Sequence, residues 1–183
     1  MTRHGYHVAR TCPHMTPRTA MLSASIILGI LLALAVSTPF MAPFGTFVHL
    51  DGLPAYMDHG WQGHGAAGAA YMLGDIVCHQ EMDRSFILNG SQMPICIRDT
   101  GILAGAVAGC AAATTLIGKL TGRRVLTIGV ILTLVTGAEW FLEGTIGDMP
   151  CPRFLSGIVT GIGASVLLGW WIMEARLRQT TVI

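Results

Sequence analysis

The amino-acid sequence predicts an all-α integral membrane protein, a bundle of four membrane-spanning helices. The first observation is composition: the 183 residues are 52% hydrophobic and 11% charged, whereas soluble domains carry about 25% charged residues. The second is that four apolar segments have about the ~20 residues that a spanning helix requires. These segments lack the alternation of barrel strands, and lipid offers no partner for free backbone groups, so the spans are helical.

The third observation is the placement of Lys and Arg, which indicates how the helices cross the membrane. Eight of the eleven lie before the first span, between the second and third, or after the fourth, and the positive-inside rule assigns these regions to the cytoplasm. We therefore expect a cell-membrane protein with cytoplasmic tails at residues 1–20 and 175–183 and one four-span domain at 21–174. No basic stripe of the kind that binds nucleic acid is present, so the lipid bilayer is the expected partner.

The first span, about residues 21–43, ends where Pro43 removes a backbone donor. A long outer segment, residues 44–99, follows it. Between Pro54 and Gln80 this segment is typical of one or two short helices, and its tyrosine and tryptophan residues suit the head-group region. We expect a partly helical segment that lies on the outer interface and covers the end of the bundle.

The second span (100–118) and the fourth (154–174) carry glycine at every fourth position. Small residues at this spacing form a flat face on which another helix can approach closely. The pattern predicts that these two spans pack against each other. The glycines are Gly101, Gly105 and Gly109 in the second span and Gly157 and Gly161 in the fourth.

The third span, about residues 125–143, ends with two carboxylates, Glu139 and Glu143, which share one helix face because they are four residues apart. An ionisable group at bilayer depth is costly and is a candidate functional residue. For Glu139 two interpretations stay open, a functional carboxylate and a structural ion pair to Arg98 or Arg153. Glu143 is interpreted as an outer-face carboxylate.

Two similar stretches open the second and fourth spans: CIRDTGILAG at 96–105 and CPRFLSGIVTG at 151–161. The shared Cys-x-Arg followed by glycine favours an internal repeat of two hairpins over coincidence. If the second and fourth spans pack together, their N-termini and the two arginines direct positive charge at one place. Asp99, Glu139 and Asp148 are expected close enough to these helix ends to balance the positive charge.

Cysteine and histidine at this outer level admit three interpretations. The residues are Cys78, His79, Cys96 and Cys151. A disulfide, most simply Cys78–Cys96, is the structural default on the oxidising side of a membrane. A metal site for zinc or another thiophilic ion is the second, although adjacent cysteine and histidine do not easily bind one ion and no C-x-x-C occurs. A redox-active thiol pair beside a helix N-terminus is the third.

The arginines and acids have a functional interpretation of their own, an outer site for a small anion or a lipid head group. The alternative is that they only pair with one another. Four short glycine-packed spans leave little room for a wide pore without oligomerisation, and no G-x-S-x-G serine-hydrolase motif is present. The candidate ligand-binding residues are Arg84, Arg98, Asp99, Glu139, Glu143 and Arg153.

One set of motifs lies within about residues 70 to 165. It consists of Cys78-His79-Gln80, Arg84-Ser85-Phe86, Gly90, Pro94, Cys96, Arg98, Thr100, Gly101, Gly105 and the late Arg153 and Gly157. In these residues the stretch resembles a family of small prokaryotic multi-pass membrane proteins catalogued as a domain of unknown function. Members of that family often carry cysteine directly after the arginine of Cys-x-Arg, where this chain has Asp99, and this departure argues against a site built on C-x-x-C. The resemblance implies a membrane protein with a Cys/His/Arg outer site and supplies no reaction.

These observations lead to one working hypothesis and two alternatives. The hypothesis is that the outer-face Cys/His/Arg/Glu site binds a metal or a small anionic ligand. The first alternative is an enzyme, a membrane thiol oxidoreductase coupled to a quinone-type carrier. The second is a structural subunit of a larger membrane complex, and self-association of the chain stays equally open.

Overall fold

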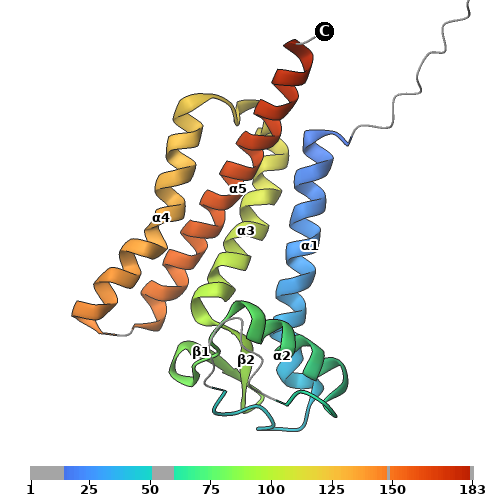
Figure 1. Ribbon diagram of the computed structural model, residues 1–183, viewed down its shortest axis with the longest axis vertical. Coiled ribbons are helices and arrows are strands. Elements are labelled where there is room, and N and C mark those ends of the chain that lie inside the picture. The colour runs from blue at the N-terminus through green and yellow to red at the C-terminus, as the bar shows by residue number, and fades with distance from the viewer. Residues whose placement is uncertain (1–14, 51–59, 148, 182–183) are drawn as a thin grey trace, which may run out of the picture.

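Four long helices dominate the computed structural model, which describes residues 15–50, 60–147 and 149–181 (Figure 1). They are α1 (Pro17–Ser37), α3 (Ile97–Leu116), α4 (Gly122–Ile146) and α5 (Pro150–Thr181). Within the described ranges, these four helices have the length and apolar composition needed to cross a membrane. The predicted all-α class and the four spans are thereby confirmed.

Helices α3 and α5 form the central pair, with α1 packed on α3 and α4 packed on α5. The glycine faces make this contact: a Cβ on Gly101 would collide with the Phe154 carbonyl, and one on Gly157 would collide with the Arg98 carbonyl. The contact is reciprocal, since each glycine meets the carbonyl three residues before the other. Gly105 and Gly161 repeat the relationship one turn further along, against Ile158 and Ile102. The predicted packing is present, whereas the internal repeat stays a prediction.

The helix ends differ most from the sequence-based bounds at the C-termini of α1 and α5. Helix α1 begins at Pro17 and gives way at Thr38 to a 3₁₀ turn, η1 (Thr38–Met41). Because Pro39 has no N–H to donate, the helix ends before the predicted residue 43. Helix α5 continues to Thr181, past the predicted end at 174, so most of the expected tail is helical. The first fourteen residues of the N-terminal tail lie outside the described residues.

A short helix and a β-hairpin fill the segment between α1 and α3. The helix is α2 (Gly65–Val77), followed by a 3₁₀ turn, η2 (Met82–Arg84), and the strands β1 (Ser85–Leu88) and β2 (Ser91–Cys96). The strands pair antiparallel with Leu88 opposite Ser91. Their two-residue turn has positive φ at Asn89 (50°) and Gly90 (67°), the conformation that Asn-Gly favours in hairpins. The expectation of one or two short helices for this segment missed both strands.

This segment lies at one end of the bundle, next to the end of α1 and the start of α3 (Figure 1). Side-chain amides connect its parts: Gln80 Nε2 donates to the Pro94 carbonyl at 2.9 Å, and Gln92 Nε2 donates to the Gln80 carbonyl at 2.8 Å. Asn89 Nδ2 donates to the Pro39 carbonyl at 2.9 Å, which attaches the hairpin turn to the end of α1. The hydrogen bonds fix the position of β2, and therefore of Cys96, relative to α2.

Candidate functional site

Cys78, His79 and Cys96 form a cluster at the junction of α2, β2 and α3. Cys78 follows the last residue of α2, and Cys96 is both the last residue of β2 and the N-cap of α3. One ligand atom from each of the three residues lies within 4.8 Å of the others. Both cysteines are buried and His79 is partly exposed. The fold thus brings together residues that are eighteen positions apart in the chain.

The local backbone explains why the two sulfurs meet. Gln80 adopts a positive φ of 50°, which turns the chain sharply after Cys78 and His79, and its fully buried side chain is held by β2. Two backbone amides then approach the sulfurs. Cys96 N–H donates to Cys78 Sγ at 3.2 Å, and Asp99 N–H lies 3.5 Å from Cys96 Sγ in the N-terminal turn of α3.

The two thiols do not titrate alike. Their mutual hydrogen bond, together with burial, raises the pKa of the Cys78 thiol. The same hydrogen bond, with Cys78 as the donor, lowers the pKa of Cys96. A thiolate at Cys96 is also favoured by its place at the N-terminus of α3. The hydrogen bond therefore makes Cys96 the more acidic thiol of the pair.

The geometry changes two expectations about this cluster. The ligand atoms of adjacent Cys78 and His79 lie within 4.8 Å of each other, so adjacency in the chain does not keep them apart, and the binding of one ion by both stays a prediction. Cys151 is exposed at the start of α5 and is not part of the cluster. The sulfurs of Cys78 and Cys96 are near each other and unbonded, and a disulfide between them stays a prediction.

A second group of polar side chains lies in the same end of the bundle, between α3, α4 and α5. Arg98 donates to Glu139 at 3.0 Å and to Glu143 at 2.9 Å. Arg153, which is 2% exposed, donates to Glu143 at 2.7 Å. Ser156 adds a hydrogen bond to Glu139 at 3.2 Å. Two arginines and two glutamates thus form a nearly buried cluster whose formal charges sum to zero.

Glu143 has a more central place than the sequence suggested. It is not merely an outer-face carboxylate, because its Oε1 accepts hydrogen bonds from both Arg98 and Arg153. Arg84 forms an ion pair with Glu81 at 2.8 Å and lines a hollow of about 510 Å³ together with Trp140, Phe141 and Glu143. Asp99 lies beside the cysteines instead, and Asp148 lies outside the described residues.

Sequence reasoning missed two contributors. Gln80 belongs to the resemblance motif, yet only the structure shows that its amide joins α2 to β2. Thr136 and Thr160 share a hydrogen bond of 2.7 Å between α4 and α5, one turn deeper than Glu139. Hydroxyls at every third or fourth position on facing helices were the available signal.

Comparison with known proteins identifies relatives for this part of the chain. The family described as "Predicted membrane protein (DUF2085)" matches residues 78–167, which include both clusters. An uncharacterized protein of Methanothermobacter thermautotrophicus is 33% identical over 93 residues, which are 50% of this chain and 83% of that protein. No solved structure matches the chain. The match to that relative extends over most of the relative's length. The chain therefore belongs to the DUF2085 family of predicted membrane proteins.

Proposed function

We propose that the Cys78–His79–Cys96 cluster binds a thiophilic metal ion, with zinc as the best-suited candidate. The observation that carries the proposal is the approach of two sulfurs and one imidazole nitrogen to within 4.8 Å of one another. Two thiolates and one imidazole are three of the four ligands of a tetrahedral zinc site. Water, or the carboxylate of Asp99 in the next turn, would supply the fourth.

The alternative ligand of the original hypothesis, a small anion at the arginines, has less support. Arg98 and Arg153 are already paired with Glu139 and Glu143. An anion would have to displace a carboxylate from a partly buried pair, which leaves that carboxylate without its partner at high cost. At the cysteine cluster the competing contacts of the described residues are those of Glu81, whose N–H donates to His79 Nδ1 at 3.3 Å and whose carboxylate lies 3.9 Å from the same nitrogen.

Metal content of the purified protein tests the proposal directly. Inductively coupled plasma mass spectrometry should find about one zinc per chain, and Cys96→Ser should lose it. Cys151→Ser is the matched control, because that thiol lies outside the cluster. Equal metal content in both variants, or none in the wild type after growth with zinc, would contradict the proposal.

A second candidate, a thiol–disulfide couple, is favoured by the lowered pKa of Cys96 and its contact with Cys78. Oxidation would join the two sulfurs, release two protons and pass two electrons to an acceptor such as a quinone in the bilayer. A reduction potential of roughly −270 to −120 mV would fit a catalytic couple, whereas a value below about −300 mV indicates a structural bridge. Titration against glutathione buffers measures it.

We further propose that both clusters face the outside of the cell membrane and that both termini are cytoplasmic. The support is the Lys and Arg distribution, because the clusters lie at the opposite helix ends from Lys119, Arg123 and Arg124. Exposed Cys151 provides the test in a variant without the other cysteines. A membrane-impermeant maleimide should label it on intact cells, and labelling only after lysis would reverse the orientation.

A further inference from the structure

The exposed face of α2 is apolar along the whole helix. Four large side chains form most of it, and they are between 38% and 65% exposed: Met72, Leu73, Ile76 and Val77. The other exposed positions of α2 are glycine and alanine. Its two polar side chains, Tyr71 and Asp75, are buried on the opposite face. A helix at the surface of a soluble protein has the reverse arrangement, so the exposed face of α2 is not adapted to water.

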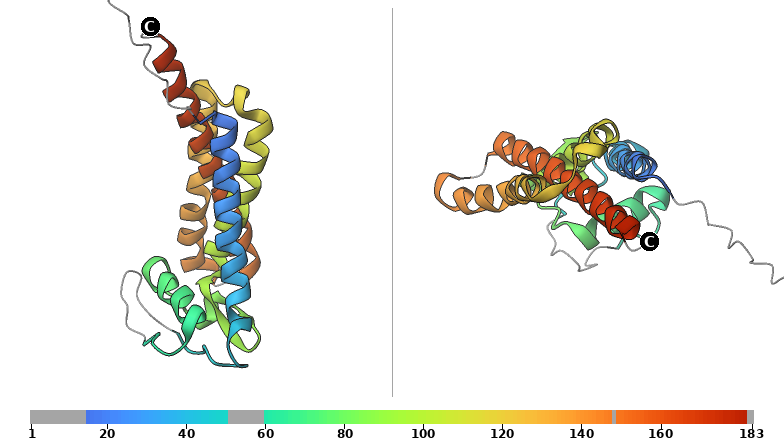
Figure 2. Two further views of the ribbon diagram at one scale, coloured as in Figure 1. Left: turned by 90° about the vertical axis from the view of Figure 1, so that its right-hand side faces the viewer. Right: turned by 90° about the horizontal axis from the view of Figure 1, so that it is seen from above.

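The position of α2 places this face at the depth of a membrane span. The helix packs against β2 and against η1 (Thr38–Met41), and η1 is the last part of the candidate span Pro17–Met41. Two perpendicular views show α2 beside the last turns of α1 rather than beyond them (Figure 1, Figure 2). Phe40 and Met41 in η1 are 62% and 53% exposed, so the surface of the span is still apolar at the level of α2.

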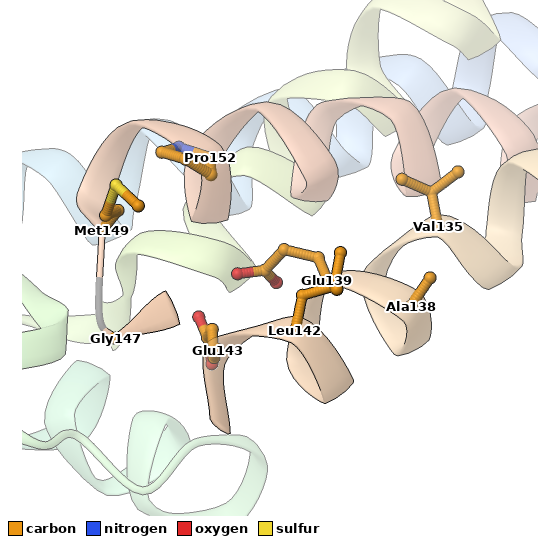
Figure 3. A pocket seen from close by; sticks show the side chains of 8 residues that line it. All are labelled: Val135, Ala138, Glu139, Leu142, Glu143, Gly147, Met149 and Pro152. Carbon is orange, nitrogen blue, oxygen red and sulfur yellow. The ribbon is translucent and has the colours of Figure 1, made fainter. Parts of the chain in front are cut away.

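Charged groups at this end of the bundle are turned inward as well. Glu139 and Glu143 lie between α4 and the start of α5 (Figure 3), where they pair with Arg98 and Arg153. Enclosed polar groups together with exposed apolar ones are the arrangement that a hydrocarbon surrounding favours. Both α2 and the charge cluster have this arrangement.

We propose that α2 is seated among the acyl chains of the membrane leaflet at this end of the bundle, with its four large exposed side chains facing lipid. A helix that lies in the interface gains stability from the apolar area that it buries in lipid. Helices of this kind usually keep a polar face toward water, but α2 does not need one, because its other face packs closely on the Trp61 carbonyl and on the Pro94 carbonyl of β2.

This assignment differs from the sequence-based expectation, which placed aromatic rings in the head-group region. Tyr71 is fully buried and stacks on Trp61, so these rings support α2 from inside the protein and other side chains contact the membrane. Because α2 ends at Val77, directly before Cys78, the cysteine cluster then lies at the edge of the acyl-chain layer. The inference does not depend on whether that cluster binds a metal.

A second copy of the chain is a weaker candidate for covering the face. Each partner in a stable protein interface buries about 800 Å², and four partly exposed side chains on one short helix present much less than that. Lipid needs no minimum area, and it already surrounds the neighbouring span.

A photoreactive residue on this face identifies what covers it. Leu73 and Ile76 are replaced, one at a time, by an aliphatic amino acid that carries a diazirine, and the protein is reconstituted in phosphatidylcholine vesicles and irradiated. The carbene inserts into its nearest neighbour, so mass spectrometry should find one phospholipid added to the chain. Mild ester hydrolysis should then leave a fatty acid on the labelled peptide, because the acyl chain is the part that was labelled.

Two control positions bracket the result. Ile30, which is 54% exposed on α1, should give the same phospholipid adduct, and exposed Gln62, which precedes α2, should react with water instead. Yields of lipid adduct at Leu73 and Ile76 near that of Ile30 support the proposal. Water adducts as frequent as at Gln62, a covalent bridge between two chains, or label confined to the head group would each overturn it. The two probe positions are read separately, so one of them decides even if the other variant fails to fold.

Discussion

The backbone amide of Cys96 donates a hydrogen bond of 3.2 Å to the sulfur of Cys78. This contact joins the residue that follows α2 to the residue that precedes α3. The Cys78 sulfur therefore contacts the residue that caps the start of a membrane-spanning helix. Arg98, two residues further on, is held by Glu139 and Glu143, so the cysteine cluster and the charge cluster share one helix N-terminus.

Oxidation and metal binding should exclude each other at these cysteines. Treatment with diamide should join Cys78 to Cys96, with the loss of two hydrogens from the linked peptides, because the sulfurs are already neighbours. Zinc added first should prevent this, since both thiolates are then occupied. Mass spectrometry of the digested protein measures the bridge.

The control for that experiment is the Cys110→Ser, Cys151→Ser double variant, which keeps the cluster intact. Cys110 is buried against Ser165 in the middle of the bundle, away from Cys78. The double variant should behave like the wild type. Protection by zinc that disappears in it would show that the metal binds elsewhere.

Close packing of α3 on α5 should make the protein sensitive to Gly105→Ala. A methyl group there collides with the backbone of Ile158, and forcing extra volume into a packed contact costs about 1–3 kcal/mol. The melting temperature of the detergent-solubilised protein, followed by circular dichroism, should fall. Gly137→Ala on α4 is the matched control, because its methyl group meets no atom within 4 Å. If both variants have the same melting temperature, the close contact does not contribute to stability.

The long helices could be predicted because bilayer thickness imposes a length and a composition on each span. The pairing of α3 with α5 was predictable for a similar reason, since glycines such as Gly101 and Gly157 mark a face that only a close neighbour can use. Both signals are local in the sequence, and neither requires knowledge of the rest of the fold.

The hairpin and the cysteine cluster depend on contacts between distant residues. Asn89-Gly90 is a residue pair typical of hairpin turns, whereas Pro94 disfavours a strand in general. Pro94 is tolerated here because the two-stranded ladder leaves one edge of β2 outside the pairing. The approach of His79 to Cys96 depends on the left-handed backbone of Gln80, which no periodicity reveals. Glu143 was underestimated because the sequence could not show that two arginines converge on it.

The pairing of two arginines with two glutamates in the charge cluster should contribute to the stability of the protein. Glu143→Gln removes a carboxylate that accepts from both Arg98 and Arg153. Breaking a buried pair costs about 3–5 kcal/mol, so thermal unfolding should show a large loss. Glu174→Gln is the control, because that carboxylate accepts an exposed hydrogen bond from Gly122 at the other end of the helices. A loss of the same size in both variants would mean that the cluster has no special role.

Tyr71 should make the stability of the segment between α1 and α3 depend on pH in the alkaline range. Burial raises the pKa of Tyr71 above its ordinary value of 10.0, and its hydroxyl donates to the Gln92 carbonyl. Below pH 10 the side chain is neutral in both the folded and unfolded states, so its full contribution is present. Above pH 10 only the unfolded state ionises, and the free energy of unfolding should fall by about 1.4 kcal/mol per pH unit until the folded state ionises as well.

The comparison with Tyr71→Phe isolates this effect from every other alkaline titration. The variant should be less stable at neutral pH by about 1 kcal/mol, because it lacks the hydrogen bond, and it should lose less stability above pH 10. Fluorescence of Trp61 reports the transition, since its ring stacks on Tyr71 with centroids 5.3 Å apart. Parallel stability curves for the two proteins between pH 9 and 11.5 would show that Tyr71 ionises while folded. Its burial would then not hold the hydroxyl neutral, and the contact to β2 would contribute little to the position of Cys96.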